Sequence, residues 1–194
     1  NDDYNIAILG DMTVTTAVAF ENTGTLTIGN QTSDVSTFTG GLVATAPSAI
    51  SLAGTLTTGT TNTMTLGDGG TGITLSDSTT LTSGGAAAIN INGALAGASV
   101  DDDLTINSAG ITTVNAAITQ IRNLVTNATG TTVIVANITS DGTQTYGDAV
   151  QIKTADRVIT TTGDAVLFSG TIDSATGETQ GLTVAAVAGL TTFT

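Results

Sequence analysis

The feature that most restricts how this chain can fold is the alternation of aliphatic residues with Thr, Ser or Asn in many short runs. Examples are Leu26-Thr27-Ile28, Met64-Thr65-Leu66 and Leu104-Thr105-Ile106. A period of two places the aliphatic side chains on one face of a strand and the polar side chains on the other. Gly and Asp, which favour turns, separate these runs. The sequence therefore predicts an all-β protein with many short, half-buried strands.

Only one segment has the apolar spacing of a helix. Between Asn115 and Asn127, the residues Ile118, Ile121 and Leu124 recur at intervals of three. This segment lacks strong signals for the start and the end of a helix, so we expect strands here as well.

Internal self-similarity indicates how the strands are organised. Leu26-Thr27-Ile28 recurs as Leu104-Thr105-Ile106 and as Leu182-Thr183-Val184, and both offsets are 78 residues. We expect one continuous elongated domain made of a partial repeat at 1–25, complete units at 26–103 and 104–181, and the start of a further repeat at 182–194.

Such a repeat of short strands favours a parallel β-helix, or β-solenoid, in which each strand pairs with its equivalent one turn away. With about 20 residues in each turn, the chain would make about ten turns and a rod of about 45–50 Å. The alternative is a set of antiparallel β-sandwich modules, because alternation does not distinguish parallel from antiparallel pairing.

Composition excludes several classes of function. The 194 residues contain no Cys and no His, so a nucleophile–imidazole pair, His or Cys metal sites and disulfides are absent. The net charge is −13, and only Arg122, Lys153 and Arg157 are basic. No positive patch is therefore available for nucleic acid. The longest apolar stretch, Val184 to Leu190, is too short to cross a bilayer. We expect no enzymatic activity, no nucleic-acid partner and no membrane insertion.

The 44 Thr residues have an expected structural use. On successive turns of a solenoid, equivalent Thr side chains stack on the solvated face and can exchange hydrogen bonds. Their aliphatic neighbours would fill the interior.

Asp101-Asp102-Asp103 is the densest cluster of charge and a candidate metal site. Three adjacent carboxylates offer the oxygen ligands that Ca²⁺ prefers, although a solvated turn before Leu104 explains the cluster equally well. The segment Gly69 to Leu75 has the glycine spacing of a calcium-binding β-roll, but Thr74 stands where the liganding Asp is expected. No cofactor is required, and calcium is the one candidate.

Two further groups of residues have simple structural explanations. Gly-Asp follows a large apolar side chain at Asp11, Asp68 and Asp148. These three carboxylates would form a column if the repeats stacked in register, whereas turn chemistry explains them without a column. Lys153 and Arg157 are the basic residues that a polysaccharide-cleaving β-helix would use, and surface charge is their other explanation.

The segment from Leu104 to Asp173 resembles the β-strand repeats of filamentous-haemagglutinin-type adhesins of bacteria. The resemblance lies in Leu-Thr-Ile-x-x-Ala-Gly-x-Thr-Thr-Val from Leu104, in Gly142 to Val150, and in Thr161 to Asp173. It is clear over 104–194 and weaker elsewhere. It implies a secreted right-handed β-helix that serves in adhesion or as a stalk.

These observations favour a structural protein. We expect an extracellular or cell-surface fibre module, part of a filament, stalk or adhesin. Strand-like sequences at Asn5 to Leu9 and at Leu190 to Thr194 predict self-association end to end. The alternative is a β-helix that binds or cleaves carbohydrate, with cell-surface glycans as partners. A third possibility is a passive spacer within a very large adhesin.

Overall fold

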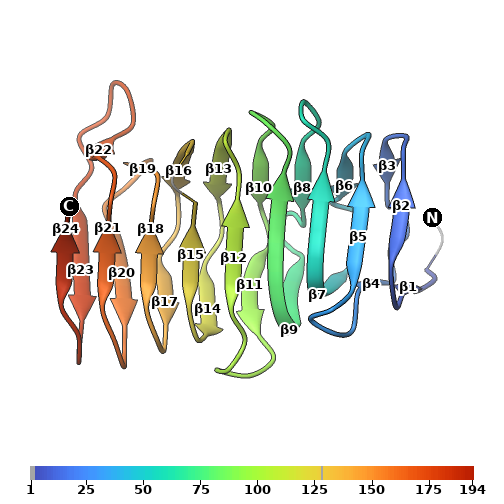
Figure 1. Ribbon diagram of the computed structural model, residues 1–194, viewed down its shortest axis with the longest axis horizontal. Coiled ribbons are helices and arrows are strands. Elements are labelled where there is room, and N and C mark those ends of the chain that lie inside the picture. The colour runs from blue at the N-terminus through green and yellow to red at the C-terminus, as the bar shows by residue number, and fades with distance from the viewer. Residues whose placement is uncertain (1–2, 128) are drawn as a thin grey trace.

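The computed structural model describes residues 3–127 and 129–194 and forms a parallel β-solenoid (Figure 1). The described residues contain 24 strands and no helix. Every strand pair is parallel, and each strand pairs with its equivalent in the preceding or following turn. The predicted solenoid is confirmed, and parallel pairing excludes the antiparallel sandwich. Strands also replace the helical spacing between Asn115 and Asn127.

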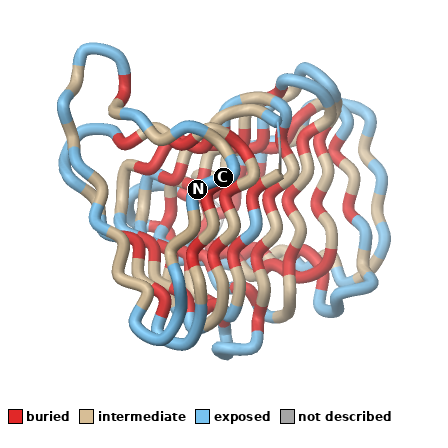
Figure 2. The backbone as a smooth tube through the Cα atoms, turned by 60° about the vertical axis from the view of Figure 1, so that its left-hand side comes forward, coloured by how far each residue is buried: buried red, intermediate tan, exposed pale blue. Residues whose placement is uncertain are grey.

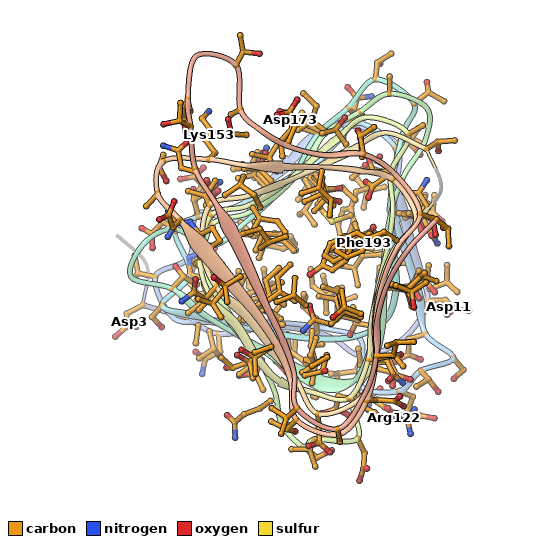
Figure 3. All side chains as sticks on the ribbon, turned by 90° about the vertical axis from the view of Figure 1, so that its left-hand side faces the viewer. Asp3, Asp11, Arg122, Lys153, Asp173 and Phe193 are labelled. Carbon is orange, nitrogen blue, oxygen red and sulfur yellow. The ribbon has the colours of Figure 1, made fainter. Side chains whose placement is uncertain are left out.

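Each turn contributes a strand to each of three faces, which surround the interior (Figure 3). The long strands β7 (Ala49–Thr58) and β9 (Gly72–Ser83) bend from the first face to the second and join these faces into one sheet. The other strands of the first face are β1 (Ile6–Ile8), β4 (Thr25–Ile28), β11 (Ala94–Gly97), β14 (Ile118–Ile121), β17 (Ile138–Ser140), β20 (Arg157–Thr161) and β23 (Leu182–Ala186).

The second face continues the same sheet, and the third face is a separate sheet of eight strands. The remaining strands of the second face are β2 (Met12–Val14), β5 (Val35–Phe38), β12 (Leu104–Asn107), β15 (Leu124–Thr126), β18 (Gln144–Tyr146), β21 (Val166–Phe168) and β24 (Thr191–Phe193). The third face comprises β3 (Val18–Ala19), β6 (Leu42–Ala44), β8 (Met64–Leu66), β10 (Ile89–Ile91), β13 (Ile111–Val114), β16 (Thr131–Ile134), β19 (Ala149–Ile152) and β22 (Ile172–Ser174).

The rod has fewer turns than we expected from the sequence. Paired residues on the first face are 20 to 25 positions apart, as from Ile6 to Leu26 and from Ile159 to Val184. The chain therefore makes about eight turns instead of ten. Eight strand spacings of about 4.8 Å give a length of roughly 38 Å. The turns are longer than expected because the corners between faces hold extra residues.

The interior is built from columns of aliphatic side chains that run along the rod. The alternating burial predicted from the sequence is present in many strands, and buried and less buried segments alternate along the tube in Figure 2. On the first face, one inward column holds only branched aliphatic residues: Ile6, Leu26, Ile50, Ile73, Leu95, Ile118, Ile138, Ile159 and Val184. The regular strand spacing lets these side chains pack against each other in line, and they contribute to a core that residues from all three faces share.

Aromatic residues occupy the same kind of column near the C-terminal end of the second face. Tyr146, Phe168 and Phe193 stack in three successive turns, with ring centroids 5.0 Å and 5.4 Å apart and nearly parallel planes. Tyr146 also donates a hydrogen bond to Oε1 of the buried Gln144 at 2.7 Å. Amide Nε2 of Gln144 in turn donates to the backbone of Thr160 at 2.8 Å. Both the Nε2 and the Oε1 atom of the buried Gln144 therefore have a hydrogen-bond partner.

The expected stacking of Thr is confirmed on the outside of the second face. One column holds Thr13, Thr37, Thr57 and Thr82 in four successive turns. Within the part of the chain that the structure describes, however, no hydrogen bond joins neighbouring hydroxyls in this column. These β-branched side chains therefore contribute strand geometry and packing, and the hydroxyl ladder that we expected does not form.

The 78-residue similarity does not correspond to a whole number of turns. Leu26 and Leu182 lie in strands of the first face, whereas Leu104 lies in β12 of the second face. The turn is therefore the repeating element of the structure. The unit boundaries at residues 26, 104 and 182 stay a prediction about sequence similarity alone.

Substitution of an inward aliphatic residue tests this arrangement. Leu56 is completely buried and lies between Ser36 and Leu81 in its column. We expect Leu56→Ala to lower the free energy of unfolding by about 2–5 kcal/mol, because the neighbouring turns cannot collapse into the cavity. Urea denaturation measures this loss. The outward-facing Thr57→Ala is the matched control and should change stability by less than about 0.5 kcal/mol.

Candidate functional site

The two ends of the solenoid carry strands that are paired on one side only. Within the described residues, β23 and β24 pair only with the turn before them, and β1 and β2 only with the turn after them. Phe193 lies over the interior at the C-terminal end (Figure 3). It is 64% exposed although its ring stacks on Phe168. Each end therefore presents inward-type side chains beside unpaired backbone.

The hydrogen bonds of β24 show which of its backbone groups are free. Thr194 N–H donates to the carbonyl of Phe168 at 3.0 Å, and Val166 N–H donates to the carbonyl of Leu190 at 3.1 Å. Because backbone groups alternate in direction along a strand, the N–H groups of Thr191 and Phe193 point away from β21. They are donors for a further parallel strand.

The candidate metal residues Asp101, Asp102 and Asp103 lie in the corner between β11 and β12. Asp101 is exposed, and its N–H donates to Oγ of Ser99 at 3.0 Å. Asp102 is buried, and its carboxylate accepts the N–H of Ser99 at 2.8 Å. Two of the three residues are therefore used in building the turn.

The third carboxylate, that of Asp103, forms a salt bridge with Arg122 of the same chain. Nε and Nη2 of Arg122 donate to its two oxygens at 2.9 and 2.6 Å, and Nδ2 of Asn123 donates at 2.9 Å. The hydrogen bond from Arg122 is the main reason why the pKa of Asp103 is lowered, and the charge of the guanidinium adds to the effect. Sequence analysis did not pair these residues, because Arg122 lies one turn away.

The structure does not bring these three carboxylates together around one point. Among the described residues, no group of three Asp, Glu, His or Cys side chains could hold a metal ion. A calcium site at Asp101, Asp102 and Asp103 stays a prediction. The geometry that is present supports the alternative, a structured turn before Leu104.

The Asp103–Arg122 pair should contribute to acid stability. Since the pKa of Asp103 is lower in the folded chain, its stabilising effect is present above the ordinary pKa of Asp, about 3.9, and is lost as the pH falls through the lowered value. We expect Asp103→Asn to weaken the dependence of the melting temperature on pH below about pH 4. Melting curves followed by circular dichroism measure this, with the exposed Asp101→Asn as control. Equal slopes for wild type and Asp103→Asn would contradict the assignment.

The Gly-Asp sequences lie at three different corners and form no carboxylate column. Asp11 precedes β2, Asp68 follows β8, and Asp148 separates β18 from β19. Oδ1 of Asp68 accepts hydrogen bonds from the N–H of Gly70 and the hydroxyl of Thr71, both at 2.8 Å, and the bond from Gly70 does most to lower its pKa. These contacts agree with the turn chemistry expected from the sequence.

Asp148 differs from the other two because it is buried. It is 4% exposed, and its two oxygens accept hydrogen bonds from the hydroxyls of Thr126 at 2.7 Å and Thr132 at 2.8 Å. Burial raises the pKa of Asp148, and the two Thr hydrogen bonds oppose this only in part. The carboxylate of Asp148 therefore links its own turn to two hydroxyl groups of the preceding turn.

The buried Asp148 should lower stability toward neutral pH. Because its pKa is raised on folding, the folded chain holds the proton more tightly, so the free energy of unfolding falls as the pH rises from the ordinary pKa through the raised one. We expect Asp148→Asn to remove this fall and to be at least as stable as wild type at pH 7. Urea midpoints between pH 4 and pH 8 measure it. The exposed Asp164→Asn, as control, should keep the fall.

The basic residues Lys153 and Arg157 lie in the corner that follows β19. Nη2 of Arg157 donates to the hydroxyl of Thr154 at 2.7 Å and to the carbonyl of Lys153 at 3.3 Å. Oε2 of Glu178, in the long loop after β22, accepts the N–H of Thr154 at 2.6 Å. Arg157 is thus part of the corner, and the exposed Lys153 lines a groove against that loop.

Sequence analysis missed a concentration of amide side chains on the outside of the third face. Asn90 and Gln151 lie in one outward column, and the Nδ2 group of Asn115 donates to Oδ1 of Asn92 at 2.7 Å beside it. Asn92 and Asn115 become neighbours only when the turns are stacked, and Asn90 and Gln151 lie three turns apart in the same column. The grooves beside the loop after β22 lie on the same side.

Comparisons with known proteins add no relative. No family model, no curated protein and no solved structure matches this chain. In the portion of the chain described by the structure, no helix has the length and apolarity needed to span a membrane.

Proposed function

We propose that this chain is a structural module of an extracellular or cell-surface filament, stalk or adhesin, which associates end to end with copies of itself. The observation that carries the proposal is the match between the two open ends. Each end has unpaired parallel strands whose inward residues continue the interior columns. A second copy in the same orientation would extend the solenoid by its own pairing rule.

The side chains at the two ends are compatible in type. On the first face, Ile6 of the next copy would follow Val184 in a column that is aliphatic throughout. On the second face, the exposed ring of Phe193 would meet Met12, which begins the same column. A thioether against an aromatic ring is a favourable contact. End-to-end pairing would therefore bury Phe193 and satisfy the free donors of β24.

The lateral surface supports a rod. The outward columns of the first and second faces are mostly Thr, Ser, Ala and Val, and the chain as a whole carries a net charge of −13. Mutual repulsion between such rods favours contact at the ends over aggregation side by side. In a longer protein, the same edges would join further turns, and the module would serve as a spacer.

The proposal contains no catalytic step, no nucleic acid and no membrane insertion. The chain lacks His and Cys. Of its two buried Asp residues, Asp148 accepts hydrogen bonds from two Thr hydroxyls and Asp102 accepts the N–H of Ser99. The alternative of a carbohydrate-cleaving β-helix would need a free acid and base in a groove. A carbohydrate-binding role is compatible with a rod.

A proline on the free edge tests end-to-end pairing. We expect Thr191→Pro to shorten or abolish filaments of the 194-residue chain, because it removes a backbone donor that faces the next copy. Thr194 N–H donates to β21, and by the alternation of backbone groups Thr192 N–H also points toward β21, so this pairing remains available. Filament length in electron micrographs and light scattering over a range of concentrations measure the change.

The control is Thr191→Val, which keeps the backbone donor and has almost the same shape. It should assemble like wild type. Wild-type chains that stay monomeric at high concentration, or equal assembly by the Pro and Val variants, would contradict end-to-end association. Melting curves establish that both variants are folded.

A further inference from the structure

The outside of the third face carries a row of hydrogen-bonding side chains that the fibre role does not explain. One outward column runs along the rod through Ala19, Val43, Thr65, Asn90, Thr113, Val133, Gln151 and Asp173. Its polar stretch begins at Thr65, and within it only Val133 is apolar and buried. The two amides and two hydroxyls are half-buried at their bases and face outward, because the alternate residues of the same strands are buried. We call this column the third-face track.

A second row of amides lies beside the third-face track. Asn115 follows β13, and its side chain bonds that of Asn92, which follows β10. Lys153 occupies the corresponding position after β19, where its N–H donates to the carbonyl of Ile134 at 3.1 Å. Val135 stands between Asn115 and Lys153 in this second row, so its amides are confined to two adjacent turns. Amide groups combine donor and acceptor in one side chain, so both kinds of partner are offered there and in the third-face track.

Part of the track, from Thr113 to Gln151, lies in a groove of about 370 Å³ that residues of the long loop after β22 also line. Its floor is formed by Thr113, Val133 and Gln151, and Lys153 and Glu178 line it. Ile111, which is 52% exposed, adds an apolar surface. The loop rises above the rest of the rod near Lys153 and Asp173 (Figure 3). The groove thus combines one apolar surface with several convergent polar groups, as small-molecule sites do.

Charge selects among the possible ligands. The groove and its neighbour contain Glu178 and Asp173 against the single cation Lys153, and the whole chain has a net charge of −13. An anionic polymer would be repelled at long range. A neutral ligand rich in hydroxyls can use the amides, the Thr hydroxyls and the free carboxylate oxygens without paying for charge repulsion.

Because the track is straight, it favours an extended ligand. Its residues repeat at the strand spacing, about 4.8 Å, along a rod without a bend. The sugars of an extended β-1,4-linked chain follow one another in a straight line at a similar interval. Alternate rings are turned over, so every second sugar would present the same edge to the track. A helically coiled polysaccharide would leave the track after a few residues.

We propose that the third-face track binds a neutral, extended β-linked polysaccharide that lies along the rod and is held partly in the groove beside Lys153. Gln151 and Asn90 donate to and accept from its hydroxyls, Ile111 covers an apolar face of a sugar ring, and Lys153 donates to a ring hydroxyl. This binding is independent of end-to-end association, because the track lies on the side of the rod.

Titration of the 194-residue chain with cellopentaose tests the proposal. We expect saturable chemical-shift changes confined to the third face. Gln151→Ala should weaken binding by about 3- to 10-fold, the effect of a lost hydrogen bond, and the Asn90→Ala Gln151→Ala double variant should weaken it further. Asn107→Ala on the outside of the second face is the matched control and should bind like wild type.

Two further probes make the outcome decisive. Maltopentaose, which coils, and tetragalacturonate, which is anionic, should both bind more weakly than cellopentaose. Absence of saturable binding to cellopentaose, equal binding of maltopentaose, tighter binding of tetragalacturonate, or the same loss in the Asn107→Ala control would each overturn the proposal. Circular dichroism establishes that the alanine variants are folded.

Discussion

The structure depends on one interaction, the parallel backbone pairing of each turn with the next. A strand of three or four residues cannot satisfy its own N–H and C=O groups, so each turn needs a neighbour on both sides. The same pairing aligns equivalent side chains, which is why inward columns such as Ile50 above Leu26 form without specific complementarity. It also leaves open edges at β1 and β24, because a stack always has two ends. The candidate for self-association is thus a direct consequence of the fold.

The number of residues varies in the corners between faces more than in the strands. Turn length changes by several residues along the rod, and most paired strands keep one register throughout. The register shifts within two pairs, between Leu52 and Gly54 of β7 and between Ile118 and Ile121 of β14. The extra residues are placed between faces, where side chains replace the missing backbone pairing. Asp103 is held by Arg122, and Asp148 by Thr126 and Thr132. Carboxylates in these corners therefore contribute local structure, and their altered pKa values report hydrogen bonding and burial.

The sequence was informative about local structure and much less so about relations between turns. Alternation in Leu26-Thr27-Ile28 correctly predicted a strand and its buried face. The identical pattern in Leu104-Thr105-Ile106 belongs to another face, because all three faces obey the same alternation and a match cannot tell them apart. Burial of Asp148 was not predictable for a related reason. Its Gly-Asp sequence is indistinguishable from an exposed turn until Thr126 and Thr132 are placed around it. Asn90 and Gln151 align only after the turn lengths are known.

The two proposed activities use separate parts of the rod and reinforce each other. Pairing at the ends leaves the third face uncovered, since only edge strands such as β24 and β1 take part. If copies continue the solenoid in register, their third-face tracks become collinear, and one polysaccharide chain can contact several copies. Each contact through residues such as Gln151 is individually weak, because water competes for every hydroxyl. Once the first contact is made, the others occur at high effective concentration, so a filament would hold an extended polysaccharide far more tightly than a single module.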